Sequence, residues 1–487
     1  MLTRSYLDPD SSKSLLAYTP MLHARLFSET QKFRDAHFQP VRLDGGSQKP
    51  WLDGNPSIDR PLFVQFCANK HEELLEAARF VEPYCDAVDL NLGCPQGIAR
   101  SGRYGAFLQE DWDTIYRLIN NLHNELSVPV TAKIRILGTK ERTLEYAKMI
   151  LSAGASIITV HGRRREQKGH NMGTADWSYI RYLRDNLPQD TVIFANGNIL
   201  NRDDVRPCLE ATGADAVMSA EGNLSDPTIF ANSPPAGQTS REYWRGRNGQ
   251  EGYRIDGVVR RYMGIMYQYV LEIAPPKRSV LYLPGDQEAP QALRSEADIR
   301  LDDSDRPIKP KSELGSKLSS PSLKAMQGHL FQLLRPMLST HTDIRDSLAK
   351  CRVGDMSAFE HVLEMVEDAV KIGLQEYENE RVGKQTDLGG GTRQNRESSA
   401  NAASFPKDTV EKYKRPWWIC QPYIRPLPEE ALRTGALKLS KKELAKAEGE
   451  KEANNVVITR GNSDLDPDKP QASRLRPDHP QSALVCG

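Results

Sequence analysis

The feature that most constrains the fold is an alternation of short apolar runs with longer helical stretches through the first half of the chain. The runs are short and rich in β-branched residues, which is typical of buried strands. There are seven of them, at residues 15–21, 62–68, 87–93, 130–136, 156–162, 191–197 and 216–222. Stretches with helical spacing, such as 72–81, 112–124 and 143–153, lie between them. This alternation predicts a parallel sheet whose strands are joined by crossover helices.

The fold class that we predict is α/β, with a TIM-type (β/α)8 barrel. A standard barrel needs eight strands, however, and the pattern supplies seven. Residues 1–14 are too short and polar to hold a further strand and helix, so the first strand is missing from the pattern. Two interpretations stay open: the N-terminus is truncated, or something else completes the barrel.

The chain divides into regions of different composition. We expect a polar segment at 1–14 and a catalytic barrel at 15–232, followed by a helical domain at 233–380, where apolar residues recur with helical spacing. Residues 280–320 are rich in Pro, Asp, Ser and Lys and predict a disordered insertion within that domain. The tail at 381–487 is expected to be mostly disordered, apart from the aromatic segment 416–426. We expect that segment to dock on the body of the protein, with stacking on RNA bases as the alternative.

Charge and cysteine content narrow the function classes. The 487 residues include 65 Lys and Arg and 65 Asp and Glu, so the net charge is zero. The overall electrostatic potential therefore does not favour binding of nucleic acid. A local bias exists at 241–278, with eight Lys or Arg against four Asp or Glu. Seven cysteines without paired zinc spacing fit a reducing compartment and no metal site. Without a membrane-length apolar run or a signal peptide, we expect a cytoplasmic protein, with the nucleus as a second location because of the lysine-rich stretch 438–451.

The segment 89–96, DLNLGCPQ, ends one predicted strand in a turn that carries a cysteine. Gly93 lets the backbone turn, and Pro95 holds Cys94 extended. A thiol at the carboxyl end of a barrel strand is placed for chemistry. The alternative is a buried cysteine that acts as a small hydrophobe.

Polar side chains also recur at the ends of the other predicted strands. Lys133 alternates with apolar neighbours, so it points away from the helix-covered face and into the barrel. A buried ammonium is costly unless it is paired or bound to a ligand. The same pattern is found for four further residues: Gln65, His161, Asn196 and Asn198. All of these side chains are expected at the same open end of the barrel, which predicts a ligand site there.

Together with the segment 101–108, SGRYGAFL, the cysteine motif resembles the signature of the tRNA-dihydrouridine synthases. These are flavoenzymes that reduce a uridine in tRNA with a cysteine as proton donor. The extended motif is most similar to the eukaryotic branch that acts on positions 16 and 17 of the D-loop. The resemblance covers residues 18–230 and continues weakly to about 380. Members of the family begin with a strand and a Pro-Met turn that contacts the flavin, and Pro20 and Met21 are not that turn, because they belong to the second strand of the pattern.

The resemblance implies roles for particular residues. Cys94 would be the catalytic proton donor, Gln65 and Lys133 would contact the isoalloxazine, and His161 would lie beside it. The FMN phosphate would be held by Asn196, Gly197, Asn198, Ala220 and Glu221. Ala220 and Glu221 stand where many bacterial members carry Gly-Arg, which leaves only their backbone amides as ligands. Contacts to tRNA are implied for Asn91, Arg135, Arg163, Arg164, Arg165 and Lys168, with a solvated charge run as the alternative for the arginines.

The implied reaction is the reduction of uridine to 5,6-dihydrouridine, with hydride from reduced FMN to C6 and a proton from Cys94 to C5. NADPH or NADH would re-reduce the flavin as a transient donor, since no Rossmann fingerprint follows a predicted strand. The partner would be the D-loop of tRNA, with no membrane partner, and we expect a monomer. Two alternatives stay open: an FMN barrel of the dihydroorotate dehydrogenase type, and a non-catalytic tRNA-binding protein that lost its flavin with the first strand.

Overall fold

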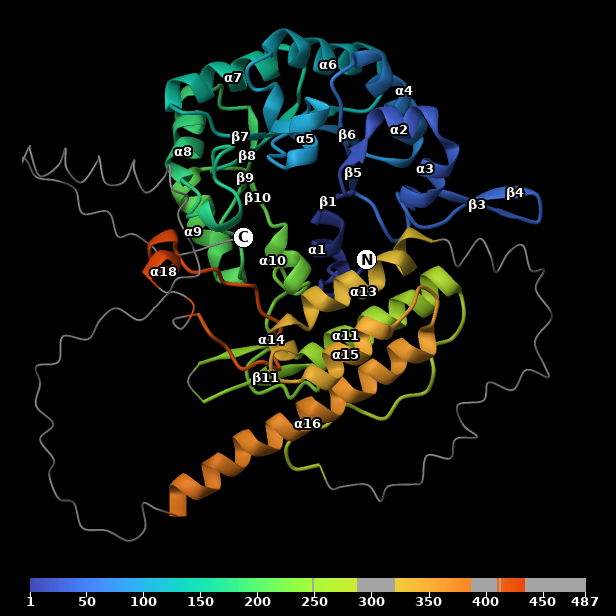
Figure 1. The fold of residues 1–487 in the computed structure, drawn as a ribbon, viewed down its shortest axis with the longest axis vertical. Coiled ribbons are helices and arrows are strands. Elements are labelled where there is room, and N and C mark those ends of the chain that lie inside the picture. Colours follow the sequence, from blue (N-terminus) through green and yellow to red (C-terminus); the bar gives the residue numbers. More distant parts are fainter. Residues whose placement is uncertain (248, 287–319, 387–409, 411–412, 434–487) are drawn as a thin grey trace, which may run out of the picture.

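The computed structural model describes residues 1–247, 249–286, 320–386, 410 and 413–433 (Figure 1). Most of the predicted insertion and tail lie outside these residues, as does the lysine-rich stretch 438–451. The described part forms two bodies, an α/β barrel and a helical domain, and a C-terminal segment contacts both.

A parallel sheet of eight strands forms the centre of the first body. Two of these strands, β1 and β2, share one edge position, so the sheet has seven strand positions. Strand β5 pairs on one side with both β1 and β2 and on the other side with β6, and the order then continues through β7, β8, β9 and β10. Each predicted apolar run contributes to one position, which confirms the α/β, TIM-type class of fold. The strands are β1 (Ala17–Tyr18), β2 (Leu22–His23), β5 (Leu62–Cys67), β6 (Ala87–Leu92), β7 (Val130–Arg135), β8 (Ile157–His161), β9 (Val192–Asn196) and β10 (Ala216–Met218).

The sheet is open between β1 and β10 in the part of the chain that the structure describes. The N-terminal residues, with η1 (Arg4–Tyr6) and α1 (Pro9–Ser14), contact elements next to both edges. The Arg4 guanidinium donates to the carbonyls of Leu15 at 2.6 Å and Pro61 at 2.8 Å, beside β1 and β5. Thr3 Oγ1 lies 3.0 Å from Asn223 Oδ1, in the helix that follows β10. The polar segment at 1–14 therefore packs beside the open edges of the barrel (Figure 1).

Helices cover the outer face of the sheet, as crossover connections require (Figure 1). In α6 the buried residues Ile115, Leu118, Ile119 and Leu122 form one apolar stripe, which matches the helical period. Helix α7 begins earlier than predicted because the Thr139 side chain caps it. The helices of this body are α2 (Ala24–Glu29), α3 (Gln31–His37), α4 (His71–Val81), α5 (Gly97–Gly102), α6 (Trp112–Glu125), α7 (Lys140–Ser152), α8 (Trp177–Asn186), α9 (Val205–Thr212) and α10 (Glu221–Ser225).

Short elements complete the barrel. A hairpin of β3 (Val41–Asp44) and β4 (Ser47–Pro50) projects from it (Figure 1). Four short 3-10 helices lie in the connections between the strands and helices of this body: η2 (Glu82–Tyr84), η3 (Gly105–Leu108), η4 (Gly169–Asn171) and η5 (Arg202–Asp204).

The second body is mostly helical and has its own apolar core, which includes Val258, Met326, Leu330 and Val366. Most of its helical residues lie within 233–380, the range in which the apolar residues recur with helical spacing. Among the described helices, none combines the length and the apolar character that crossing a membrane requires. The elements are β11 (Tyr243–Arg245), β12 (Glu251–Tyr253), α11 (Ile255–Ile265), the π-helical η6 (Met266–Leu271), α13 (Pro321–Leu333), α14 (Arg335–Leu338), α15 (Thr342–Lys350) and α16 (Met356–Thr386).

The aromatic segment of the tail packs into the helical domain. The backbone N–H of Ile255 donates to Trp418 O, and that of Cys420 donates to Tyr253 O, both at 2.9 Å. Trp418, Ile419 and Cys420 are buried in the core of this domain. Docking on the body is therefore what the structure shows for this segment, and the buried Trp418 ring is not exposed to stack on RNA bases.

Candidate active site

The polar residues predicted at the strand ends do converge on the carboxyl end of the barrel. The strand register places Gln65 opposite Asp89, and Asn91 opposite Lys133. On the next two strand pairs, His161 lies opposite both Arg135 and Asn196. We call this polar end of the barrel the mouth.

A buried carboxylate, Asp89, lies at the centre of the polar network. It accepts hydrogen bonds from Gln65 Nε2 at 2.8 Å and Thr131 Oγ1 at 2.6 Å. Burial raises the pKa of Asp89 to about 6, against the opposing effect of these two donors. Asp89 was not predicted as a site residue, although the strand alternation already placed it on the same face as Asn91.

The network continues from Asp89 to the backbone of the candidate catalytic cysteine. Gln65 Oε1 accepts from Asn91 Nδ2 at 2.7 Å. Asn91 Oδ1 in turn accepts from the backbone N–H of Gly93 at 3.1 Å and of Cys94 at 2.9 Å. Asn91 was expected to touch tRNA, but here its amide ties the cysteine turn to the barrel interior.

The cysteine turn is also held from its other side. Ala106 N–H donates to Cys94 O at 3.1 Å, and Gly105 has a φ of +64°. A Cβ at Gly105 would lie 2.9 Å from Cys94 O and 3.0 Å from Cys94 Cβ, so only glycine fits. Cys94 itself is half-buried, whereas the neighbouring Cys67 is buried, which raises the pKa of Cys67 to about 12. Of these two thiols, Cys94 is therefore the one placed to react.

Lys133 extends from β7 across the mouth to β9. Its Nζ donates to Asn196 Oδ1 at 3.0 Å, and Asn196 Nδ2 is held by Met218 O at 2.9 Å. Burial lowers the pKa of Lys133 to about 8, and the charge of Arg135 adds to this effect. The nearby charge of Asp89 acts in the opposite direction and raises the pKa. Lys133 is therefore mostly protonated at neutral pH but close to losing its proton.

His161 is neutral in this setting. Burial, followed by the nearby positive charges of Lys133, Arg135 and Arg163, lowers its pKa well below the ordinary value. Arg163 Nη1 lies 3.0 Å from His161 Nε2, and because the guanidinium stays protonated, Nε2 must accept. The ring proton therefore lies on Nδ1.

Two of the residues expected to contact tRNA lie in the interior of the barrel. Arg135 and Arg163 are only 8 % and 0 % exposed. Arg135 Nε donates to Gly93 O at 2.8 Å, beneath the cysteine turn. Arg163 Nη2 donates to Gly173 O at 2.8 Å. Backbone carbonyls of the surrounding loops thus accept hydrogen bonds from both guanidinium groups. These groups hold the loops of the mouth in place and are not exposed to solvent.

The other basic residues of the set lie nearer the surface. Arg164 and Lys168 are exposed, and Lys168 Nζ donates to Pro95 O at 2.9 Å, directly after Cys94. Arg165 pairs with Glu110 at 2.7 Å. Of this set, Arg164 and Lys168 are therefore the exposed cations, and Lys168 lies directly beside the cysteine turn.

The turn after β9 is filled by protein atoms. Asn198, at a φ of +64°, bonds both the N–H and the carbonyl of Ala175 through its side chain at 3.0 Å. A Cβ at Gly197 would lie 2.7 Å from Ala175 Cβ and 2.9 Å from His161 Cδ2. The missing side chain of Gly197 therefore serves packing against the loop after β8. That the backbone of this turn binds a phosphate stays a prediction.

The turn after β10 brings in a residue that the sequence did not predict. Ala220 immediately precedes α10, and Glu221 is its first residue. The two carboxylate oxygens of Glu221 accept from Arg425 Nη1 and Nη2, both at 2.9 Å. No sequence signal links Arg425, in the C-terminal segment, to this turn.

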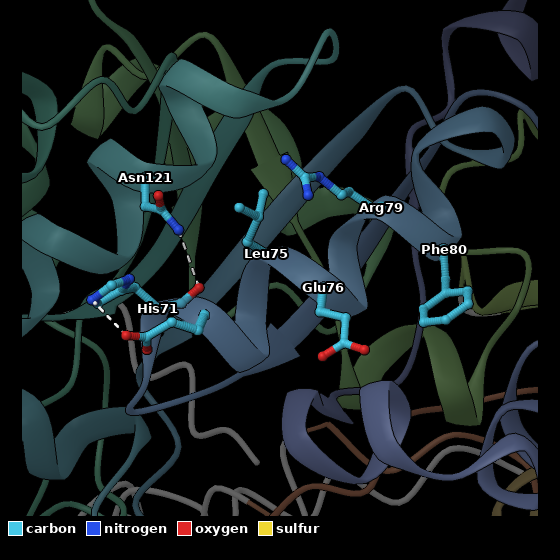
Figure 2. A pocket seen from close by; sticks show the side chains of 7 residues that line it. His71, Leu75, Glu76, Arg79, Phe80 and Asn121 are labelled. Carbon is cyan, nitrogen blue, oxygen red and sulfur yellow. Dashed lines mark hydrogen bonds and ion pairs between the residues drawn. The ribbon is translucent and has the colours of Figure 1, made fainter.

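A surface groove lies on the outside of α4 and α6, away from the mouth. Figure 2 shows it, with Asn121 Nδ2 donating to His71 O at 3.2 Å. Its lining comes from helices alone, so no strand-end residue takes part in it. Across the described residues, no three His, Cys, Asp or Glu side chains gather in a way that could hold a metal ion.

Comparisons with known proteins show which family the chain resembles. The family model described as dihydrouridine synthase matches residues 6–245. A tRNA-dihydrouridine(16/17) synthase of Saccharomyces cerevisiae is 43 % identical over 414 residues, which is 85 % of this chain and 78 % of the yeast protein. The protein of the same name from Schizosaccharomyces pombe is 41 % identical over 413 residues, 85 % of this chain and 82 % of its own length.

A more distant relative extends the match. A rat tRNA-dihydrouridine(16/17) synthase-like protein is 35 % identical over 437 residues, 90 % of this chain and 74 % of its own. Among solved structures, a dihydroorotate dehydrogenase of Eimeria tenella aligns with a TM-score of 0.29 and 17 % identity, over 36 % of this chain and 57 % of its own. That likeness is too slight to carry a structural argument.

The chain belongs to the dihydrouridine synthase family. It is an enzyme of that type, and this membership replaces the dihydroorotate dehydrogenase and non-catalytic alternatives.

Proposed function

We propose that the protein reduces uridine to 5,6-dihydrouridine in the D-loop of tRNA, at positions 16 and 17, with FMN as cofactor and NADPH or NADH as the electron donor. The observation that carries this proposal is the placement of Cys94. Its half-buried thiol lies at the carboxyl end of the barrel. The backbone N–H of Cys94 donates to Asn91 Oδ1, and Gly105 packs closely against the other side of the turn.

The residues of the mouth fit a flavin. An ammonium has three N–H groups, and among the described residues one hydrogen-bond acceptor, Asn196 Oδ1, lies within reach of Lys133 Nζ. A buried cation with donors to spare suits the carbonyl and ring-nitrogen acceptors of an isoalloxazine, and it can stabilise negative charge there. Lys133, together with Gln65 and Asn196 beside it, would hold the ring system.

The chemistry divides between the cofactor and the chain. When bound, reduced FMN supplies the hydride that reaches C6 of the uracil. Cys94 gives its thiol proton to C5 from the turn that the Asn91 amide fixes. Lys133 stabilises the negative charge that develops during the reduction. The uracil must leave its base stack to reach Cys94, as in other enzymes that act on a base.

The support for tRNA comes from the family and from the exposed Lys168, which contacts the turn of Cys94 at Pro95 O. The basic bias at 241–278 adds little, because its arginines are largely neutralised by acidic partners. Arg260 pairs with Glu367, and Arg278 pairs with Glu360, both at 2.6 Å. The monomeric state and the cytoplasmic location remain predictions.

The test uses the purified full-length chain. We expect FMN in near-stoichiometric amount after purification or reconstitution, and dihydrouridine at positions 16 and 17 after incubation of unmodified tRNA with NADPH. Mass spectrometry of tRNA fragments measures the product. FMN binding and NADPH oxidation without any dihydrouridine would remove tRNA as the substrate, and a chain that binds no FMN would remove the proposal.

A further inference from the structure

The C-terminal segment crosses from the helical domain to the mouth of the barrel. We call residues 413–433 the strap. Its first part is anchored in the helical core through Trp418, Ile419 and Cys420. Beyond them, the guanidinium of Arg335, the first residue of α14, lies 3.4 Å from the ring centroid of Tyr423. The strap is therefore fixed before it leaves the helical domain.

The strap then reaches the barrel at Arg425. Both terminal nitrogens of this guanidinium bind Glu221, and Nη1 also lies 3.9 Å from Met172 Sδ in the loop after β8. Helix α18 (Pro428–Arg433) follows and lies beside η4 of the same loop. Arg425 is thus held between the turns that follow β8 and β10.

The charge of Glu221 makes this contact significant. In TIM barrels, phosphate groups commonly bind at the loops that follow the last two strands, and here these are the loops after β9 and β10. A carboxylate beside a phosphate repels it, since both carry negative charge. The side chains of Glu221 and Arg425 are only 26 % and 29 % exposed, so solvent screens this carboxylate incompletely. The bidentate partner cancels its charge.

We propose that Arg425 is a positioning residue of the flavin site: by neutralising Glu221, it lets that edge of the mouth accept the phosphate group of FMN. This inference rests on the proposed function. The strap is then a part of the cofactor site, and the helical domain contributes to flavin binding through a single guanidinium.

The experiment compares the affinities for FMN and riboflavin, which lacks the phosphate, in the full-length protein freed of flavin. Fluorescence titration measures both dissociation constants in wild type, Arg425→Ala, Glu221→Gln and the double variant. We expect Arg425→Ala to weaken FMN binding about fivefold to tenfold and to leave riboflavin binding unchanged. Glu221→Gln should restore most of the FMN affinity when added to Arg425→Ala, because it removes the unpaired charge.

Arg335→Ala is the matched control. The guanidinium of Arg335, like that of Arg425 at 5.2 Å, lies over the Tyr423 ring, but Arg335 does not bind Glu221. In this variant, the ratio of FMN to riboflavin affinity should equal that of wild type. Equal losses for both ligands in Arg425→Ala, no loss for either, or no rescue by Glu221→Gln would overturn the inference.

Two further outcomes distinguish a contact to RNA from a failure of the proposed function. If Arg425→Ala weakens tRNA binding but leaves the ratio of FMN to riboflavin affinity unchanged, the guanidinium serves the RNA backbone and the inference is wrong. If wild type binds neither flavin, the proposed function itself fails, and the inference falls with it. Weak binding by Arg425→Ala alone cannot be mistaken for that result, because wild type is titrated beside it.

Discussion

Two strand-end turns of the mouth are held in opposite ways. The turn after β6, which carries Cys94, is fixed by residues of the barrel itself: Asn91, Gly105 and Arg135. The turn after β10, which carries Glu221, is bound by Arg425, 204 positions further along the chain. The comparison teaches that the proposed chemical step depends on the barrel alone, whereas one edge of the ligand site depends on the far end of the described chain.

The largest expected effect comes from the cysteine turn. Cys94→Ala should lower the rate of tRNA reduction about 100- to 10,000-fold, because the proton donor is lost, while FMN stays bound. Single-turnover oxidation of the reduced flavin by tRNA measures this. Cys67→Ala is the matched control, since that thiol is buried and its raised pKa keeps it protonated. A fully active Cys94→Ala variant would remove Cys94 from the mechanism.

The second effect tests how tightly the same turn must be held. Gly105→Ala places a Cβ against Cys94 at a φ of +64°, so the turn must shift. We expect the reduction rate to fall roughly 10- to 100-fold with little change in FMN affinity, because misplacement of a reacting group is costly. Gly138→Ala, where a Cβ meets no atom within 4 Å, should behave like wild type. Equal rates in the two variants would show that the turn tolerates movement.

The third effect concerns Lys133, which joins β7 to the last residue of β9. Since its pKa is about 8, the charged fraction falls as the pH rises through that value. FMN affinity should therefore weaken above about pH 8 in wild type. Lys133→Met should bind FMN about tenfold more weakly at pH 7 and lose this pH dependence. Titrations of FMN across this pH range measure both, and an unchanged profile in the variant would place Lys133 outside the flavin site.

The smallest effect concerns the buried Asp89. The pKa of Asp89 is raised to about 6 in the folded protein. Between about pH 4 and 6, Asp89 is therefore protonated in the folded state but ionised in the unfolded state. Stability from this group is therefore lost as the pH rises through that window. Relative to Asp89→Asn, wild type should lose about 2–4 °C in melting temperature between about pH 4.5 and 7. A constant difference between the two proteins would show that Asp89 does not change its charge there.

The sequence predicted the features that local patterns encode. The seven strand positions follow from apolar alternation, and the convergence of Gln65, Lys133, His161 and Asn196 follows from the parallel arrangement of those strands. The cysteine turn was found because its residues are contiguous. These features need no knowledge of which distant segments meet.

What the sequence missed depends on distant contacts. Arg135 and Arg163 looked like ligands for phosphate, because a sequence shows a charge but not the carbonyl groups that will surround it. The sequence likewise gave no sign that the side-chain amide of Asn198 binds Ala175 in the loop after β8. The docking of the segment 416–426 was expected, but the partner of Arg425 was not, since Glu221 is remote in the sequence.

The sequence separation of Arg425 and Glu221 also has a meaning for biosynthesis. All seven strand positions of the barrel have left the ribosome long before residue 425 is made. At about 5–20 residues per second, the 204 residues between the two partners take roughly 10–40 s to synthesise. During that interval a nascent barrel carries an uncompensated carboxylate beside its last strand. Translation therefore sets the order of maturation: the cysteine turn can form early, and the mouth acquires its final charge only when the strap arrives.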